Sequence, residues 1–368
     1  MTGLTQRIAL LPGLALGLLL LAGCEPPTAE STQNGYRGTG MLQLQQPDRA
    51  AELMALNVAP APEPPAPDIP GLPSNWENVE VLNGLNTLEM NRIMTAMSKW
   101  VGEENNCNYC HVAGNFAADD KYQKVVSRRM LQMTQHINST WTDHVAETGV
   151  TCYTCHRGNN VPENIWWQDP GPETVAQFSG NRKGQNAPGK VASAYSTLPY
   201  DPFSPYLVDD TNIRLQSTVA LPGDHEASIA STEGTYALMM HMSDSLGVNC
   251  TFCHNTRAFG EWEQSTPQRV TSWYGIRMAR DLNNSFLNPL QGVYPEHRLG
   301  PLGDAPKANC ATCHQGVNKP LMGAQMVKDY PSLQQASGEQ MSATPASAAA
   351  TTAQAAGEVM ASDSAGGG

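Results

Sequence analysis

The chain is poor in aromatic and in basic residues. Aromatic side chains make up 7% and hydrophobic ones 40% of the 368 residues, which is modest for a chain that must bury a core. Lys and Arg total 22 against 34 Asp and Glu, so the net charge is −12. This balance argues against a nucleic-acid-binding protein, which needs a basic face. It suits a basic partner that docks by electrostatic steering.

Long hydrophobic runs are scarce as well. One mostly apolar stretch covers residues 8–21 and is interrupted by a Pro-Gly pair, and it is shorter than the ~20 residues that a membrane-spanning helix needs. Arg7 before it and small residues after it are typical of a secretory signal. Leu21-Ala22-Gly23-Cys24 resembles a bacterial lipobox, so we expect cleavage after residue 23 and acylation of Cys24. The alternative is an uncleaved membrane anchor, and either interpretation places the body outside the cytoplasm.

Eight of the nine cysteines lie in four copies of Cys-x-x-Cys-His. The cysteines are Cys107 and Cys110, Cys152 and Cys155, Cys250 and Cys253, and Cys310 and Cys313, followed by His111, His156, His254 and His314. Two intervening residues let both sulfurs reach the vinyl carbons of a haem, and the adjacent His then binds the iron from the proximal side. The motifs therefore predict four covalently attached haem c groups. Four haems would also supply apolar bulk that the side chains lack.

Other uses of Cys-x-x-Cys fit less well. A zinc ribbon pairs two such motifs about 15–20 residues apart, whereas the first cysteines here recur after 45, 98 and 60 residues. A thioredoxin-like redox pair needs one motif near a βαβ pattern. A disulfide within one motif is disfavoured because a two-residue loop is strained.

The composition changes along the chain. Seven prolines within residues 58–73 predict an extended, semi-rigid strap, and residues 336–368 have too few large apolar side chains to offset the entropy of ordering. We therefore expect a lipoprotein signal peptide at 1–23, an N-terminal anchor and strap at 24–73, dihaem halves at 74–190 and 191–330, and a disordered tail at 331–368.

The two halves repeat each other. Asn106–His111 matches Asn249–His254, and Thr151–Gly158 matches Asn309–Gly316. The preceding segments match too, because Met94, Met97 and Gly102 parallel Met239, Met242 and Gly247. The repeat predicts two halves related by an approximate two-fold axis, each holding two haems.

Hydrophobic periodicity predicts a mainly α fold with long loops. The expected helices cover residues 87–101, 120–137, 235–246 and 268–282, with Gly102 and Gly247 where helices stop. Strand signals are weak, and residues 159–222 are expected to be a long loop. The predicted fold class is a multihaem cytochrome c.

A haem that only carries electrons needs a sixth iron ligand, and Met raises its potential. The candidates, with haems counted along the sequence, are Met94 or Met97 for haem 1, Met130 or Met133 for haem 2, and Met239 or Met242 for haem 3. For haem 4 the repeat points to Met278, but a long loop separates it from Cys310. Five histidines lie outside the motifs: His136, His144, His225, His241 and His297. The residues alone leave haem 4 open.

Motif number, spacing, lipobox and repeat together resemble the tetrahaem cytochrome subunit of purple bacterial photosynthetic reaction centres. The resemblance covers about 74–330 and is carried by the stretches 149–158, 272–278 and 309–320. It implies three His/Met haems, with Met94 for haem 1, Met130 for haem 2 and Met239 for haem 3. It implies a His/His haem 4 in which His144, from the first half, is the partner of His314.

The resemblance also implies the function and the partners. The chain would be an electron carrier without catalytic residues, lipid-anchored on the periplasmic face of the photosynthetic membrane. It would bind core subunits of the L and M type and re-reduce their photo-oxidised bacteriochlorophyll pair. A soluble cytochrome c or a high-potential iron–sulfur protein would donate electrons, entering at haem 1 and leaving from haem 3. The rival functions are a multihaem reductase with an open iron, and a respiratory quinol oxidase or periplasmic electron wire.

Charged residues suggest further roles. Arg269, Arg277 and Arg280 share one predicted helical face with Trp273, and this face is either solvated or neutralises haem propionates. Glu103, Glu104, Asp119 and Asp120 flank the first motif; they are solvated charges or steer a basic donor toward haem 1.

The haem 4 assignment leads to a prediction. Met278→Leu should leave all four haem spectra unchanged, whereas His144→Met should raise the potential of one haem, because Met ligation favours ferrous iron. A spectroscopic redox titration measures both. Loss of a Met-ligated signal in the Met278 variant would refute the assignment.

Overall fold

The computed structural model describes residues 28–102, 107–170, 198–215 and 228–334. The described chain is mainly helical, with two small two-stranded antiparallel sheets. The expected signal peptide and Cys24 lie outside the described residues, as do His225, Glu103, Glu104 and residues 335–368.

The elements are as follows. The helices are α2 (Pro47–Leu56), α3 (Thr87–Trp100), α4 (Tyr122–Thr140), α5 (Thr142–Val145), α6 (Cys152–His156), α8 (Ser204–Leu207), α9 (Ile229–Leu246), α10 (Pro267–Asp281) and α11 (Cys310–His314). Shorter turns of helix are η1 (Cys107–Tyr109), η2 (Ala146–Thr148), η3 (Cys250–Phe252), η4 (Leu282–Leu287), η5 (Asn288–Leu290), η6 (Glu296–Arg298), η7 (Pro320–Gly323), η8 (Met326–Asp329) and η9 (Pro331–Leu333). The strands are β1 (Glu30–Gln33) paired with β2 (Leu42–Gln45), and β3 (Ile165–Trp166) paired with β4 (Lys307–Ala308).

The mainly helical fold and all four predicted helices are confirmed. The helices expected at 87–101, 120–137 and 268–282 are α3, α4 and α10. The one expected at 235–246 begins earlier, at Ile229, because the Ser228 side chain caps it by accepting a hydrogen bond from the Ser231 backbone. Gly247 ends this helix at φ +63, the left-handed conformation in which Gly is favoured.

Helix α3 shows how the packing of the first half begins. Asn86 and Glu89 form a capping box at its N-terminus. One face buries Met90, Ile93 and Trp100, and the Trp100 ring packs edge-on against Tyr330 at 4.7 Å between ring centres. An amphipathic face with a strong cap therefore sets this helix against a segment more than 200 residues away.

The C-terminal part of the described chain lies in the core of the first half. Leu321, Val327 and Leu333 are buried in the same cluster as α3. Asn138 of α4 also donates to the Leu333 carbonyl at 2.8 Å. The packed chain thus extends beyond 330, where the tail was expected to start, and residues predicted for the second half or the tail complete the core of the first.

The internal repeat has a structural counterpart in helix contacts. The Gly158 amide after α6 donates to the Trp100 carbonyl of α3 at 2.9 Å, and the Gly316 amide after α11 donates to the Ser245 carbonyl of α9 at 2.8 Å. The short helix of motif 2 therefore contacts α3 in the same way as the short helix of motif 4 contacts α9.

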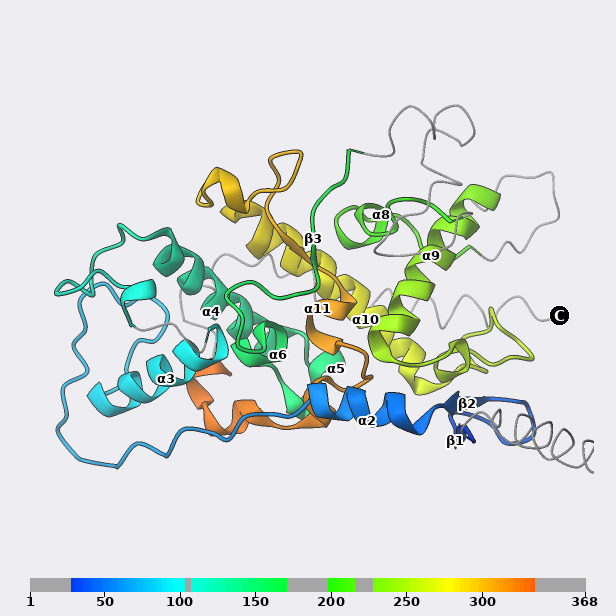
Figure 1. The fold of residues 1–368 in the computed structure, drawn as a ribbon, viewed down its shortest axis with the longest axis horizontal. Coiled ribbons are helices and arrows are strands. Elements are labelled where there is room, and N and C mark those ends of the chain that lie inside the picture. The colour runs from blue at the N-terminus through cyan, green and yellow to red at the C-terminus, as the bar shows by residue number, and fades with distance from the viewer. Residues whose placement is uncertain (1–27, 103–106, 171–197, 216–227, 335–368) are drawn as a thin grey trace, which may run out of the picture.

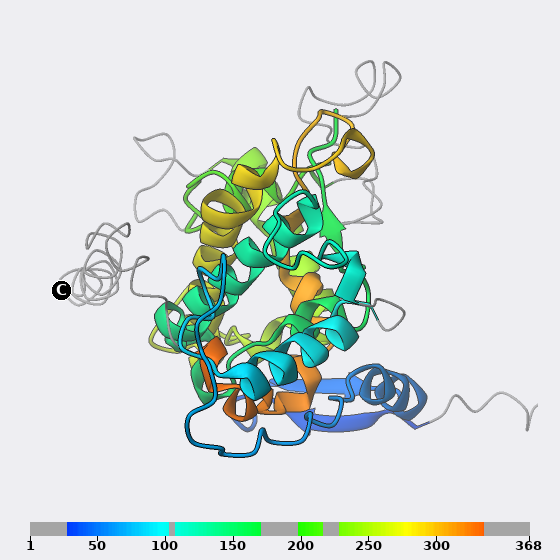
Figure 2. The same ribbon diagram turned by 90° about the vertical axis from the view of Figure 1, so that its left-hand side faces the viewer.

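The N-terminal segment runs along one side of the molecule, below the other helices in Figure 1. At one end, Gln43 of β2 donates to the Gly247 carbonyl at 2.7 Å. In the middle, the buried Asn57 donates to the Gln315 carbonyl at 3.3 Å. At the other end, Arg92 of α3 donates to the Glu63 carbonyl at 2.8 Å. In Figure 2, α3 lies toward the viewer and the hairpin of β1 and β2 lies behind it. The segment between them therefore contacts both halves.

Membrane spanning was sought in the helices of the described ranges. None of those helices combines the length and the apolar character needed to cross a bilayer.

The close packing of Gly247, at the C-terminal end of α9, against Gly316 leads to a stability prediction. A methyl group added at Gly247 would lie 2.0 Å from the Gly316 carbonyl oxygen, whereas Gly303, at φ +74, has no atom within 4 Å of the added carbon. Gly303→Ala should lower the free energy of unfolding by about 1–2 kcal/mol, the cost of the left-handed conformation alone. Gly247→Ala should cost clearly more in denaturant titrations followed by circular dichroism. Equal losses would contradict this packing.

Candidate haem sites

Motifs 1 and 3 share one backbone design. Each begins as a short helical turn, η1 or η3, and continues into a loop. The imidazole of His111 donates from Nδ1 to the Phe116 carbonyl at 3.0 Å, and that of His254 donates from Nδ1 to the Phe259 carbonyl at 2.9 Å. In both, the acceptor lies five residues after the histidine.

Motifs 2 and 4 share a tighter design. Each is a five-residue α-helix that ends at a residue in the left-handed conformation, Arg157 at φ +52 or Gln315 at φ +48. His156 donates from Nδ1 to the Asn159 carbonyl at 2.9 Å, and His314 donates to the Val317 carbonyl at 3.0 Å. Here the acceptor follows three residues after the histidine.

All four motif histidines are thus prepared in the same tautomer. A carbonyl oxygen can only accept, so Nδ1 carries the proton and Nε2 keeps the lone pair that binds a metal. Burial lowers the pKa of His156 and His254, and burial together with nearby His144 lowers that of His314 to about 4. These three imidazoles are neutral near pH 7, as iron ligation requires.

A cavity of about 300 Å³ lies over motif 2. Cys152, Cys155 and His156 line it, and so do Met130 and its competitor Met133 of α4. Most of the remaining wall is apolar, formed by side chains such as Val126, Ile137, Val150, Leu282 and Leu287. Thiols, imidazole and thioether thus converge on one apolar space, which fits a covalently attached haem with a methionine ligand.

Histidine 144 lies against motif 4. Its ring centre is 6.0 Å from that of His314, and its Nδ1 donates to the Thr271 carbonyl of α10 at 2.9 Å. At this spacing both imidazoles would be able to hold one haem iron. Burial lowers the pKa of His144, so its ring is neutral as well. The structure therefore brings together the two histidines that the resemblance pairs.

Gly275 makes this approach possible. A methyl group on it would lie 2.6 Å from Cε1 and 2.9 Å from Nδ1 of His144, closer than packed atoms can come. Gly275 is part of the stretch 272–278 that carried the resemblance, but its role depends on the packing of α5 on α10. No local signal in the sequence shows that role.

Two of the other three described histidines are engaged elsewhere. His136 contacts Asp281 through Nε2 at 2.6 Å, and the buried His241 contacts the Ser245 hydroxyl through Nε2 at 3.2 Å. His297 lines the cavity of motif 2. His136 and His241 make these contacts through Nε2, the nitrogen that a haem iron would need. His144 instead is bonded through Nδ1, as the motif histidines are.

The other methionine candidates lie in or against the hydrophobic cores. Met94 and Met97 both pack against the core of the first half, and Met97 also lines the cavity of motif 2. Met239 packs against the second-half core and Met242 is buried within it. Met278 packs against Ile137, Leu282 and Phe286. Met239 is thus less buried than Met242, whereas Met94 and Met97 are both partly buried.

Cys155 and Cys313 form a disulfide in the structure, with their Cα atoms 4.3 Å apart. The sequence predicted a thioether for each, and a sulfur atom cannot make both bonds, so haem attachment at motifs 2 and 4 requires this disulfide to be absent. The contact shows that the two motif helices meet. Burial raises the pKa of Cys152 to about 11 and that of Cys310 to about 12, so these two remain thiols.

Clusters of metal-ligating side chains were sought among the described residues. Within the described ranges, no group of three or more His, Cys, Asp or Glu side chains could hold a metal ion. The zinc alternative therefore lacks a ligand cluster in that part of the chain.

The predicted arginine face is in contact with aromatic rings. Arg269 lies over Trp262 at 4.3 Å, and Arg277 lies over Trp273 at 3.4 Å. Arg280 donates to the Tyr206 carbonyl at 3.0 Å and pairs with Asp210. The face is thus a set of packed cations, not a row of solvated charges.

Asp119, which follows motif 1, is paired with two cations of α4. Arg128 donates to both carboxylate oxygens of Asp119 and lowers the pKa of that carboxyl well below its usual range. Lys124 also pairs with it at 3.0 Å. The charge of Asp119 is therefore largely neutralised in place, which weakens its predicted role in steering a donor.

Comparison with known proteins identifies the family. A family model described as photosynthetic reaction centre cytochrome C subunit matches residues 25–334. The chain is 52% identical over 354 residues to the photosynthetic reaction center cytochrome c subunit of Rubrivivax gelatinosus, covering 96% of this chain and 94% of the relative. It is 48% identical over 329 residues to that of Thermochromatium tepidum, covering 89% and 81%. Cytochrome c-554 of Chloroflexus aurantiacus is 27% identical over 296 residues, covering 67% and 70%.

The match extends over all of the described residues and includes the four motifs. It agrees with the prediction of a c-type cytochrome that carries electrons and performs no catalysis. The chain therefore belongs to the family of photosynthetic reaction centre cytochrome c subunits, electron carriers associated with the photosynthetic membrane.

Proposed function

We propose that this chain carries four haem c groups and re-reduces the photo-oxidised bacteriochlorophyll pair of a reaction centre. The observation that carries the proposal is the fourfold Nδ1-to-carbonyl hydrogen bond of the motif histidines. It directs Nδ1 of all four imidazoles to a carbonyl and leaves Nε2 for the iron, next to a pair of cysteines in each motif. When bound, each haem supplies an iron that takes up and releases one electron at a time.

The iron ligands follow from the resemblance and fit the packing. Met94 and His111 would hold haem 1, Met130 and His156 haem 2, Met239 and His254 haem 3, and His144 and His314 haem 4. Met130 lines the cavity over motif 2, as its competitor Met133 does, and the 6.0 Å between the two imidazole centres supports His144. Six-coordinate irons would leave no open position for a substrate, as befits an electron carrier.

The protein side chains tune these sites in distinct ways. Methionine ligands raise the potentials of three haems relative to the His/His haem. Apolar walls exclude water, and burial lowers the pKa of His144 and His314 and so holds these two imidazoles neutral. We also propose that Arg269 and Arg277, half-buried on the aromatic rings of Trp262 and Trp273, neutralise haem propionates and raise a neighbouring potential.

The arrangement of the chain supports the proposed organisation. The equivalent contacts of α6 on α3 and of α11 on α9 support two dihaem halves, at 74–190 and 191–330, related by an approximate two-fold axis. The hairpin of β1 and β2 lies beside motif 3. A lipid on Cys24, a few residues before this hairpin, would hold the end with haem 3 close to the membrane.

The proposed partners follow from membership in the family. Core subunits of the L and M type would bind at the periplasmic face of the membrane, with haem 3 nearest the bacteriochlorophyll pair. A soluble cytochrome c or a high-potential iron–sulfur protein would reduce haem 1. The acidic net charge of −12 favours a basic donor.

Flash spectroscopy on native membranes tests the proposed function. After a single turnover, the haem α-bands should bleach within microseconds, in step with decay of the oxidised bacteriochlorophyll signal. Membranes in which the cytochrome gene is deleted serve as the control, and should retain the oxidised signal for longer. Haems that do not respond to light, in membranes with active reaction centres, would contradict the proposal.

The position of His144 gives a second prediction. Gly275→Ala should displace the His144 imidazole, because the added methyl would lie 2.6 Å from it. The low-spin His/His signal of one haem should shift or vanish in electron paramagnetic resonance, with the three His/Met haems unchanged. Gly292→Ala is the matched control, since its added carbon has no atom within 4 Å. An unaltered His/His signal in the Gly275 variant would count against His144 as a ligand.

A further inference from the structure

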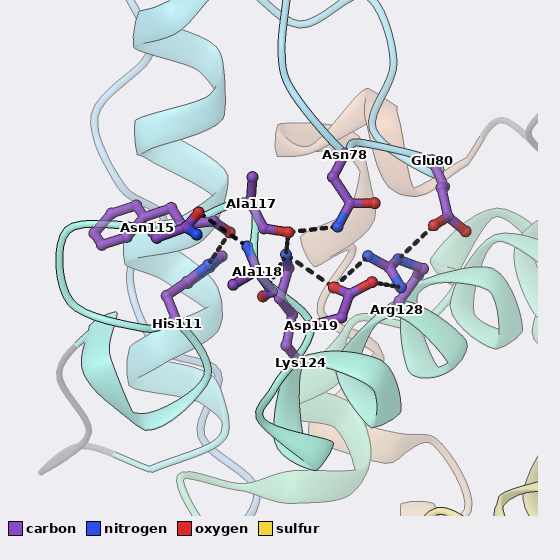
Figure 3. A network of polar contacts seen from close by, with 10 residues as sticks. Asn78, Glu80, His111, Asn115, Ala117, Ala118, Asp119, Lys124 and Arg128 are labelled. Carbon is purple, nitrogen blue, oxygen red and sulfur yellow. Dashed lines mark hydrogen bonds and ion pairs between the residues drawn. The ribbon is translucent and has the colours of Figure 1, made fainter.

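The loop after motif 1 is held by one lysine of α4. Lys124 donates from Nζ to the carbonyls of Ala117 at 2.7 Å and Ala118 at 3.0 Å, and it pairs with Asp119 at 3.0 Å (Figure 3). Its three N–H donors therefore have three acceptors. The side chain is only 11% exposed, and a lysine this buried is stable only where its charge is paired.

These two carbonyls come directly after the one that His111 uses. The Phe116 carbonyl accepts the Nδ1 hydrogen bond of His111 at 3.0 Å, and the Phe116 ring lies 4.9 Å from the imidazole. Because each peptide unit is planar and rigid, fixing the next two carbonyls restricts the orientation of the Phe116 carbonyl. Lys124 thus controls the acceptor of His111 without touching the imidazole.

In the second half, an arginine makes the equivalent contacts to the loop after motif 3. Arg269 of α10 donates to the carbonyls of Gly260 at 3.2 Å and Glu261 at 3.0 Å. These residues directly follow Phe259, whose carbonyl accepts the Nδ1 bond of His254 at 2.9 Å. The Phe259 ring stacks on that imidazole at 4.3 Å.

A second pair of contacts confirms that Lys124 and Arg269 are equivalent. Three residues after each cation, a serine hydroxyl lies 3.6 Å from the second motif sulfur. The pairs are Ser127 with Cys110 and Ser272 with Cys253. The two helices therefore stand in the same register against their motifs, and a cation at this position recurs although its type differs.

In motifs 2 and 4, the carbonyl that accepts the Nδ1 bond of the histidine is positioned differently. A left-handed residue turns the chain directly after the helix, and the accepting carbonyl is only three residues away. The local turn itself positions that carbonyl. A remote cation is useful where the loop is longer, as it is after motifs 1 and 3.

We propose that Lys124 and Arg269 are positioning residues that set the electron-donating strength of the proximal histidines of haems 1 and 3. The inference rests on the proposed attachment of haem at these motifs. A well-aligned Nδ1–H bond to a carbonyl makes the imidazole a more basic ligand, which favours ferric iron and lowers the potential. We call the bonds from each cation to the two loop carbonyls the clamp. Loss of the clamp weakens the Nδ1–H bond, and the potential of the haem rises.

The first-half clamp is also tied to the segment before α3. Asn78 donates to the Ala117 carbonyl, and Glu80 lies 3.5 Å from Arg128, which itself holds Asp119 (Figure 3). Residues from three parts of the chain therefore converge on this loop. These contacts restrict the loop that carries the Phe116 carbonyl.

Paired substitutions separate the clamp from simple charge. Lys124→Gln and Lys124→Met both remove the positive charge, but only Gln keeps an N–H donor for the two carbonyls. Haem-resolved redox titration should show a higher haem 1 potential in the Met variant than in the Gln variant. Lys124→Arg should restore the wild-type value, since Arg269 performs this role in the second half. Haems 2 and 4 should be unchanged and serve as internal controls.

The same comparison at Arg269 should move haem 3 and leave haem 1 unchanged. If the Lys124→Met protein does not fold, the Arg269 variants provide the test. If neither Met variant folds while both Gln variants do, the result also supports the role of the two cations in holding their loops. Equal haem 1 potentials in Lys124→Met and Lys124→Gln would overturn it. The wild-type haem content, measured as the pyridine haemochrome, is a separate test. Fewer than four haems per chain would contradict the proposed function, whereas four haems with equal potentials in the paired variants would contradict only the clamp.

Discussion

One hydrogen bond, from imidazole Nδ1 to a backbone carbonyl, sets the requirements that the chain around each motif must meet. It occurs at all four motifs with lengths of 2.9–3.0 Å. It fixes the tautomer and leaves Nε2 for the metal. Two backbone designs supply the acceptor: a left-handed turn after α6 and α11, and a longer loop held by a cation of α4 or α10.

The halves that the repeat suggests are interlocked in space. His144 of α5 reaches His314 of α11 because Gly275 leaves room on α10. Residues 320–334 leave the second half and complete the core around α3. The helices of motifs 2 and 4 touch each other. Separating the halves would expose buried surface on both, so the proposed haem sites keep their relative positions, on which electron transfer between them depends.

The N-terminal segment joins these parts from outside. Its hairpin binds the end of α9, its helix α2 lies on the turn after α11, and its strap is held by Arg92 of α3. Much of this segment has no regular structure, and polar side chains that donate to backbone carbonyls hold it in place. An acyl group on Cys24, as we propose, would therefore anchor both halves through one continuous segment.

The sequence by itself determined the cofactor chemistry and the long helices. Cys-x-x-Cys-His is a covalent requirement within five residues, and the 87–101 and 268–282 patterns report local periodicity that α3 and α10 confirm. The ligand of haem 4 was different, because the repeat pointed to Met278 and only the resemblance named His144. The approach of His144 to His314, the space left by Gly275, and the clamps of Lys124 and Arg269 were decided by tertiary structure. Each depends on how helices far apart in the chain pack together, and no local pattern of residues encodes that.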